Sequence, residues 1–213
     1  MSPSSLAPSR LMARIAGIAL AFAGLLVFSG CWVASINPLY DEGSFDNPHK
    51  DPDLVFDPSL TGTWSAIDGK CTTLLTITAK DQVYDLQTAE QGEGCSGEKS
   101  HRQARLVKLD THYFLDVSPI AEDVCDMCVA KHSILLANFD AATLSLTGID
   151  SDWLKESIAA KTVTLATLAG DTDTITASSK ELKAFCRQFA EDKTVFKPDS
   201  GTAFKRNRVS AGN

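Results

Sequence analysis

The sequence has no apolar run long enough to cross a bilayer as a helix. Its longest uninterrupted run covers residues 15–28, a stretch of 14 residues, whereas a spanning helix needs roughly 20. Basic residues are also scarce, because 20 Lys and Arg stand against 27 Asp and Glu and give a formal net charge of −7. Since nucleic-acid backbones are bound by lysine and arginine, this balance argues against a nucleic-acid partner.

The patterns of common catalytic sites are missing as well. The sequence has no G-x-S-x-G elbow of a serine hydrolase and no phosphate-binding P-loop. Its histidines are scattered without the H-x-x-x-H or H-E-x-x-H spacing of zinc sites, at His49, His101, His112 and His132. We therefore expect a domain with no enzymatic activity, no metal and no cofactor. A hydrolase is the least favoured alternative, because no nucleophile–base pair can be identified.

The N-terminus, in contrast, carries an export signal. Two arginines precede the run 15–28 and small residues end it, which is the pattern of a secretory signal peptide. The stretch SGC, ending at Cys31, resembles the lipobox of bacterial lipoproteins, in which the cysteine is lipidated and becomes the first mature residue. Phe28 departs from the branched aliphatic residue that the lipobox prefers. The alternatives are an ordinary signal peptide cleaved near Ala34 or a short signal anchor.

This resemblance implies an anchor and a location. Residues 1–30 would be removed as the signal peptide, and several acyl chains on Cys31 would anchor the protein stably where a single chain is marginal. Trp32 stands where enteric lipoproteins retained in the inner membrane have aspartate. We therefore expect a lipid-anchored protein of the bacterial cell envelope, in the outer membrane and facing the periplasm or the cell surface. Removal of the two arginines in the signal peptide changes the net charge of the mature chain to −9. An acidic protein is not attracted to anionic lipid, so the acyl chains alone must keep it on the membrane.

The mature chain divides into three parts. Residues 31–58 contain four prolines and no sustained period. Because proline fixes φ and removes a hydrogen-bond donor, we expect an extended tether after the lipidated cysteine, with residues 54–56 docked onto the edge of the domain. Residues 59–207 would form that domain, and residues 208–213 a disordered tail.

Short runs rich in β-branched and aromatic residues dominate the domain. They lie at 60–66, 72–78, 82–88, 102–109, 112–118, 133–139, 143–148, 162–168, 172–176 and 202–206. Separators as short as KD and LDT favour antiparallel hairpins. Two helices interrupt the strands. One covers 151–160 with Ser151 as its cap, and the other begins at a capping box formed by Ser178 and Glu181.

The first strand, LTGTWSA, carries Gly62-x-Trp64, which resembles the G-x-W signature of lipocalins and lipocalin-like lipoproteins. The stretches INPLY (36–40), YFLDV (113–117) and DWLK (152–155) are similar to an uncharacterised family of bacterial lipoproteins. In this chain a helix falls between strands seven and eight, whereas a simple lipocalin carries one C-terminal helix. The resemblance implies a mainly β fold: an antiparallel lipocalin-like barrel, or a strongly curved sheet, of about 8–10 short strands with two helices.

The same resemblance implies how the barrel closes. In lipocalin-like proteins a basic side chain from the last strand covers the tryptophan of G-x-W. The last strand here is TAFKR, in which Phe204 and Arg206 share one face by the two-residue period. We therefore expect Arg206 over the face of Trp64, next to Gly62, and Lys205 in solvent. The alternative is that TAFKR is a frayed tail.

The motif CDMC, residues 125–128, is the sharpest chemical signal. Paired cysteines in an exported chain are first interpreted as a disulfide, and acidic neighbours oppose the thiolate that redox work needs. Val129 stands where haem attachment requires histidine. His132 adds a third potential zinc ligand, but no fourth is near in sequence. His132 is also the candidate for a role in a pocket. The simpler alternative is a histidine at the end of a strand whose hydrogen bonds are satisfied within the fold.

The remaining cysteines suggest a second bridge. A hairpin turning near residues 80–81 brings residue 71 opposite residues near 90, so a Cys71–Cys95 disulfide is geometrically reasonable. Cys125–Cys128 would be the other bridge, and Cys186 a free thiol buried on the apolar face of its helix. Crossed pairing between the two sets is the rival scheme.

Two functions are compatible with such a domain. We expect it to act in protein interaction in the envelope, which requires a filled barrel that binds with its outer face. The alternative is binding or carriage of a small apolar ligand, which requires an unfilled apolar interior. Bulky residues at apparently inward positions favour the first function: Leu75, Ile77, Phe114 and Leu135.

Overall fold

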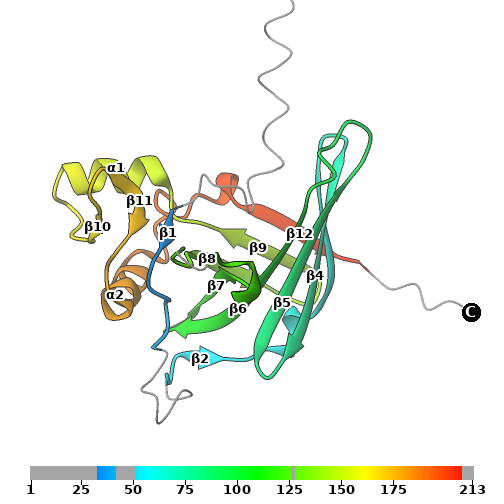
Figure 1. The fold of residues 1–213 in the computed structure, drawn as a ribbon, viewed down its shortest axis with the longest axis horizontal. Coiled ribbons are helices and arrows are strands. Elements are labelled where there is room, and N and C mark those ends of the chain that lie inside the picture. The colour runs from blue at the N-terminus through cyan, green and yellow to red at the C-terminus, as the bar shows by residue number, and fades with distance from the viewer. Residues whose placement is uncertain (1–32, 42–50, 126–127, 208–213) are drawn as a thin grey trace, which may run out of the picture.

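Eight antiparallel strands close into a barrel in the computed structural model, which describes residues 33–41, 51–125 and 128–207 (Figure 1). Each barrel strand pairs with the next along the chain, and the last one closes the ring between the seventh and the first. The strands are β3 (Gly62–Asp68), β4 (Cys71–Lys80), β5 (Val83–Gln91), β6 (Lys99–Leu109), β7 (His112–Pro119), β8 (His132–Phe139), β9 (Thr143–Thr147) and β12 (Thr202–Arg206). The expected mainly β, lipocalin-like barrel with two helices is confirmed.

Three predicted features lie outside the described residues: the signal peptide 1–30, the lipidation site Cys31 and the tail 208–213.

Tight turns connect the hairpins of the barrel. Between β4 and β5 the loop is Asp81 and Gln82, both with positive φ (51° and 64°). Two left-handed residues in succession give the turn whose twist matches that of the flanking strands. Within β4, Leu75 and Ile77 point into the barrel while Thr76 between them faces outward, as the period of two requires.

The barrel interior is filled by its own side chains. Trp64, Tyr84 and Phe204 are its largest members and are at most 1% exposed. The polar tip of Tyr84 is satisfied, because its hydroxyl donates to the carbonyl of Asp57 (3.0 Å) and accepts from the N–H of the same residue (2.8 Å). Burial raises the pKa of Tyr84 to about 12. The buried interior cluster consists of Leu60, Trp64, Leu75, Ile77, Tyr84, Leu86, Ala104, Leu106, Leu115, Val117, Leu135, Ala137, Leu144, Leu146 and Phe204.

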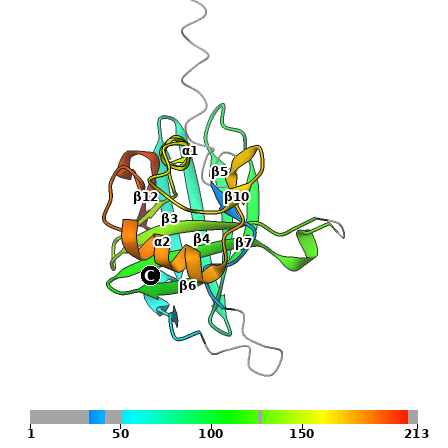
Figure 2. The same cartoon turned by 90° about the vertical axis from the view of Figure 1, so that its left-hand side faces the viewer.

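A second core lies between the outer face of β6–β8 and a layer of helices and short strands. This layer comprises α1 (Ser151–Ala159), α2 (Ser179–Phe189), β1 (Ala34–Ser35), β10 (Thr167–Leu168) and β11 (Asp171–Ile175). Helix α2 lies across the outer face of the barrel strands (Figure 2). Phe114 belongs to this outer core, 5.8 Å from the ring of Phe196, so its predicted inward position is wrong. Leu115 and Val117 occupy the inward positions of β7.

The N-terminal segment is part of the domain, which contradicts the expected tether. Strand β1 pairs antiparallel with β8 and parallel with β11. Val33 and Leu39 are buried in the outer core. Further along, β2 (Leu54–Val55) pairs with β6, as the expected docking of residues 54–56 requires. The described parts of this segment, residues 33–41 and 51–58, therefore pack on the barrel.

The two helices differ from expectation only at one cap. Helix α2 begins at the predicted capping box of Ser178 and Glu181. Helix α1 is capped by Asp150, whose carboxylate accepts the N–H of Trp153 (2.8 Å), and not by Ser151. A carboxylate at this position also interacts favourably with the helix dipole.

The predicted strand 162–168 is reduced to its last two residues, which form β10. The amides of Thr162 and Val163 donate to the carbonyl of Ser157 at the end of α1, so they are not available to a sheet. Among the described residues, three short 3-10 helices occur in addition: Pro58–Leu60, Ala121–Asp123 and Pro198–Ser200.

Candidate functional site

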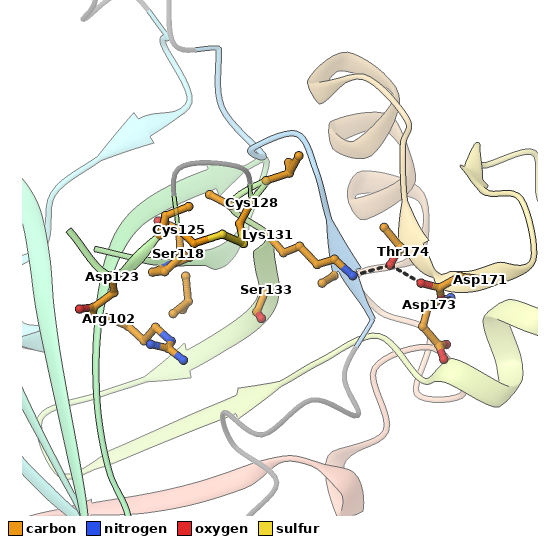
Figure 3. Close-up of a pocket in the computed structure, with 16 residues that line it drawn as sticks. Arg102, Ser118, Asp123, Cys125, Cys128, Lys131, Ser133, Asp171, Asp173 and Thr174 are labelled. Carbon is orange, nitrogen blue, oxygen red and sulfur yellow. Dashed lines mark hydrogen bonds between the residues drawn. A yellow bond between two sulfur atoms is a disulfide. The ribbon is translucent and has the colours of Figure 1, made fainter. Parts of the chain in front are cut away.

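A cleft opens at the end of the barrel where β7 ends and β8 begins. Its cavity has a volume of about 560 Å³. One side is formed by the chain that connects β7 to β8, including Cys125 and Cys128, and the other by β1 and β11 (Figure 3). Val117 and Ser133, which pair across β7 and β8, also line the cavity. The cleft therefore adjoins the filled interior without entering it.

Charged side chains of both signs stand on the two sides of the cleft. Arg102 and Asp123 lie on one side, and Asp171 and Asp173 on the other (Figure 3). Lys131 reaches across and donates to the hydroxyl of Thr174 (2.8 Å).

The hydroxyl of Thr174 donates in turn to the carboxylate of Asp171 (2.7 Å). This hydrogen bond is the main reason why the pKa of Asp171 lies below its ordinary value. Asp171 is therefore ionised at neutral pH and forms, with Lys131 and Thr174, a fixed polar chain along one wall.

This lining suits a polar partner better than an apolar one. Small-molecule sites are mostly apolar with a few placed polar groups, whereas this cleft combines two cations, three carboxylates and several hydroxyls. Apolar side chains also line the cleft, among them Val117, Val124 and Val129, and Val129 is 67% exposed. Apart from the CDMC cysteines, no sequence motif pointed to this site, because Arg102, Lys131 and Asp171 are far apart along the chain.

The cysteines of CDMC form a disulfide at the edge of this cleft. Cys125 and Cys128 are bonded to each other, with Cα atoms 5.1 Å apart. Both thiols are consumed by this bond, so the three-ligand zinc set with His132 is not assembled. In the described part of the chain, no group of three or more His, Cys, Asp or Glu side chains could hold a metal ion.

The other cysteines follow the predicted scheme. Cys71 and Cys95 form the second disulfide, with Cα atoms 5.8 Å apart. Cys186 is a free thiol, buried in the outer core, and burial raises its pKa. A buried thiol with a raised pKa is a poor nucleophile at neutral pH, so Cys186 has a packing role.

His132 lies outside the cleft, on the opposite face of β8. Its Nδ1 is 2.6 Å from a carboxylate oxygen of Asp116, and both side chains are almost completely buried. The second oxygen of Asp116 accepts the backbone N–H of Leu39 (2.6 Å). The pair thus fastens the N-terminal segment to the barrel. An acidic residue inside the apolar strand YFLDV was the available signal, because a buried carboxylate needs a partner.

The residues expected to close the barrel meet at its other end. The guanidinium carbon of Arg206 lies 4.0 Å from the centroid of the Trp64 ring, while Lys205 is exposed. Arg206 also donates to the carbonyls of Thr61 (2.7 Å), Ala141 (2.9 Å) and Ser59.

Gly62 makes this approach feasible. A Cβ atom at this position would lie 2.6 Å from a guanidinium nitrogen of Arg206.

An ion-pair network ties α2 to the segment before β2. Lys183 donates to both carboxylate oxygens of Asp51 and to Asp53, each at 2.7 Å. Burial of Asp51 opposes its ionisation, but the hydrogen bonds from Lys183 and from the N–H groups of Asp41 and Asp53 outweigh this effect. The pKa of Asp51 therefore lies below its ordinary value.

Comparisons with known proteins found no match for this chain among family models, curated proteins or solved structures. Within the described residues, no helix has both the length and the apolar character needed to cross a bilayer.

Proposed function

We propose that this protein is a lipid-anchored component of the bacterial cell envelope that binds another envelope protein through the cleft between the β7–β8 connection and β11. The observation that carries the proposal is the filled barrel. Trp64, Tyr84 and Phe204 are buried inside it together with twelve smaller side chains. A barrel packed in this way is a rigid scaffold, and the cavity of about 560 Å³ beside it is where a partner can be engaged.

Carriage of a small apolar ligand is the alternative, and it is less well supported. It requires an apolar space inside the barrel, whereas the cavity described above lies beside it and is lined by charges of both signs. Transfer of an apolar molecule to such a lining would desolvate charged groups without pairing them. A polypeptide segment with side chains of both signs would pair them instead.

The remaining parts of the proposal come from the sequence. The signal 1–30 exports the chain, lipidated Cys31 anchors it, and the acidic balance disfavours nucleic acid. The domain acts without catalysis, metal or cofactor. Two disulfides fit an oxidising compartment outside the cytoplasm.

Site-specific photocrosslinking in intact cells tests the cleft. A photoreactive amino acid replaces Val129, which lines the cleft, or Lys205, which is exposed on β12 away from it. The expected result is a discrete adduct with one protein from position 129 and none from position 205. A charge reversal, Lys131→Glu, should remove that adduct. Equal adducts from both positions, or adducts at position 129 that ignore Lys131→Glu, would contradict the proposal.

A further inference from the structure

The strand that follows the lipidation site is held in the fold from its first residues. Val33 is 4% exposed and Ser35 is fully buried. Ala34 pairs with Ser133 of β8 on one side and with Thr174 of β11 on the other. The chain therefore enters the sheet directly, between two strands.

The rest of this segment is fastened just as closely. The side chain of Asn37 donates to the carbonyl of Ala177 (2.9 Å), and the buried Leu39 donates its N–H to Asp116. Detaching residues 33–39 would expose the apolar surface of Val33 and Leu39. It would also remove a donor from the carboxylate of Asp116, which is 2% exposed. The segment therefore cannot serve as a spacer while the domain is folded.

Only one residue stands between Cys31 and Val33. Consecutive Cα atoms are 3.8 Å apart, so the Cα of Cys31 lies within about 8 Å of the Cα of Val33. The headgroup layer of one leaflet is about 5–8 Å thick, which is half the difference between the whole bilayer and its hydrocarbon core. An acylated Cys31 consequently leaves no gap between the folded domain and the lipid.

We propose that the barrel is seated directly on the bilayer, with the surface around Val33 against the phospholipid headgroups. The inference rests on the proposed lipidation of Cys31. The parallel register of β1 with β11 places Val33 level with Asp173, and the hydroxyl of Ser151 donates to Asp173 (2.5 Å). The first turn of α1 is therefore part of the seated surface.

The opposite end of the molecule faces away from the membrane. Helix α1 lies in the upper half of both views, below the loops at the upper ends of β4 and β5, whereas the turn between β4 and β5 is at the bottom (Figures 1 and 2). No strong electrostatic attraction to lipid is involved, because the mature chain carries a charge of −9. The short covalent connection alone sets the orientation.

This position of the barrel on the bilayer also determines how far from the membrane the cleft binds its partner. Ala34 lines the cleft, and its Cα lies within about 11 Å of the Cα of Cys31. The partner is therefore engaged close to the headgroup layer, which suits another membrane protein better than a freely diffusing one.

Fluorescence quenching in vesicles tests this orientation. Single-cysteine variants Asp152→Cys on α1 and Lys80→Cys on the distal hairpin are labelled with an environment-sensitive fluorophore. Both positions are exposed, and the other cysteines are bonded, lipidated or buried. The full-length lipidated protein is reconstituted with phospholipid that carries a short-range spin-label quencher on its headgroup. We expect quenching at position 152 at least threefold stronger than at position 80.

A flexible insertion of twelve glycine and serine residues between Trp32 and Val33 provides the control. It should abolish the difference in quenching while leaving lipidation, measured by intact mass, unchanged. A lipidated protein with equal quenching at both positions, or with a difference that survives the insertion, would overturn the seating alone. An intact mass without lipid would overturn the proposed anchor together with the seating.

Discussion

Arg206 joins β3, the residues before β3 and the β8–β9 turn. Its guanidinium stacks on Trp64 and donates to carbonyls of the residues before β3 and of the β8–β9 turn. We expect Arg206→Ala to reduce the free energy of unfolding by about 2–3 kcal/mol, since charge-assisted hydrogen bonds and a cation–π contact are lost together. Denaturant titration of the variant against Lys205→Ala checks this. Lys205 is exposed, and a cost as large at Lys205 would refute the role given to Arg206.

Gly62 is the residue that lets Arg206 approach. Its φ is +133°, and an added Cβ would lie 2.6 Å from a guanidinium nitrogen that is itself held by Thr61. We expect Gly62→Ala to cost roughly 2–3 kcal/mol from backbone strain and displacement of the arginine. Gly69, with φ +58° and open space around it, is the matched control. Its alanine variant should cost only about 1 kcal/mol, and equal thermal shifts of the two variants would contradict this account.

Between elements, the contact of α2 with the segment before β2 depends on one lysine. Lys183 bonds Asp51 and Asp53 and is 13% exposed in its side chain. We expect Lys183→Met to reduce the stability at pH 7 by about 3 kcal/mol, because it leaves a buried carboxylate without its partner. Lys180→Met, on the exposed face of the same helix, should change little.

The same contact predicts a dependence on pH. The pKa of Asp51 is lowered in the folded protein, so its stabilising contribution is complete above the unfolded value of about 3.9. It is lost as the pH falls through the folded value. The stability difference between the wild type and Lys183→Met should therefore shrink from pH 6 to pH 3. A difference that stayed constant over this range would show that Asp51 is not the titrating group.

Structural features that depend on neighbouring residues along the chain could be predicted from the sequence. The capping box at Ser178 and the alternation in β4 depend on neighbours along the chain, and both were predicted. Phe114 was assigned to the wrong face because β7 is buried on both sides. In a strand that is apolar on both faces, the sequence does not show which residues point into the barrel. Residues 31–58 were expected to form a tether because of their four prolines. The two-residue strand β1 within them cannot be recognised locally, because its partners lie about 100 and 140 residues further on. The cleft depends on the same kind of distant pairing.

At the scale of the whole molecule, two separate hydrophobic cores stabilise the fold. The inner one fills the barrel and leaves its wall rigid, while the outer one binds the N-terminal strand, α1 and α2 to the outside of that wall. The outer layer brings the N-terminal strand beside the cleft, since Ala34 lines it. In the proposed function this arrangement couples the anchor to the binding site through a single short strand.

Native mass spectrometry of the protein extracted from its own membranes tests the filled barrel and the lipid anchor together. We expect a mature chain that begins at Cys31, carries acyl groups on that residue, retains two disulfides and holds no apolar molecule. A filled interior leaves no space for such a molecule. A stoichiometric apolar ligand that survives extraction, or an unmodified N-terminus elsewhere in the chain, would contradict the account of a filled barrel anchored at Cys31.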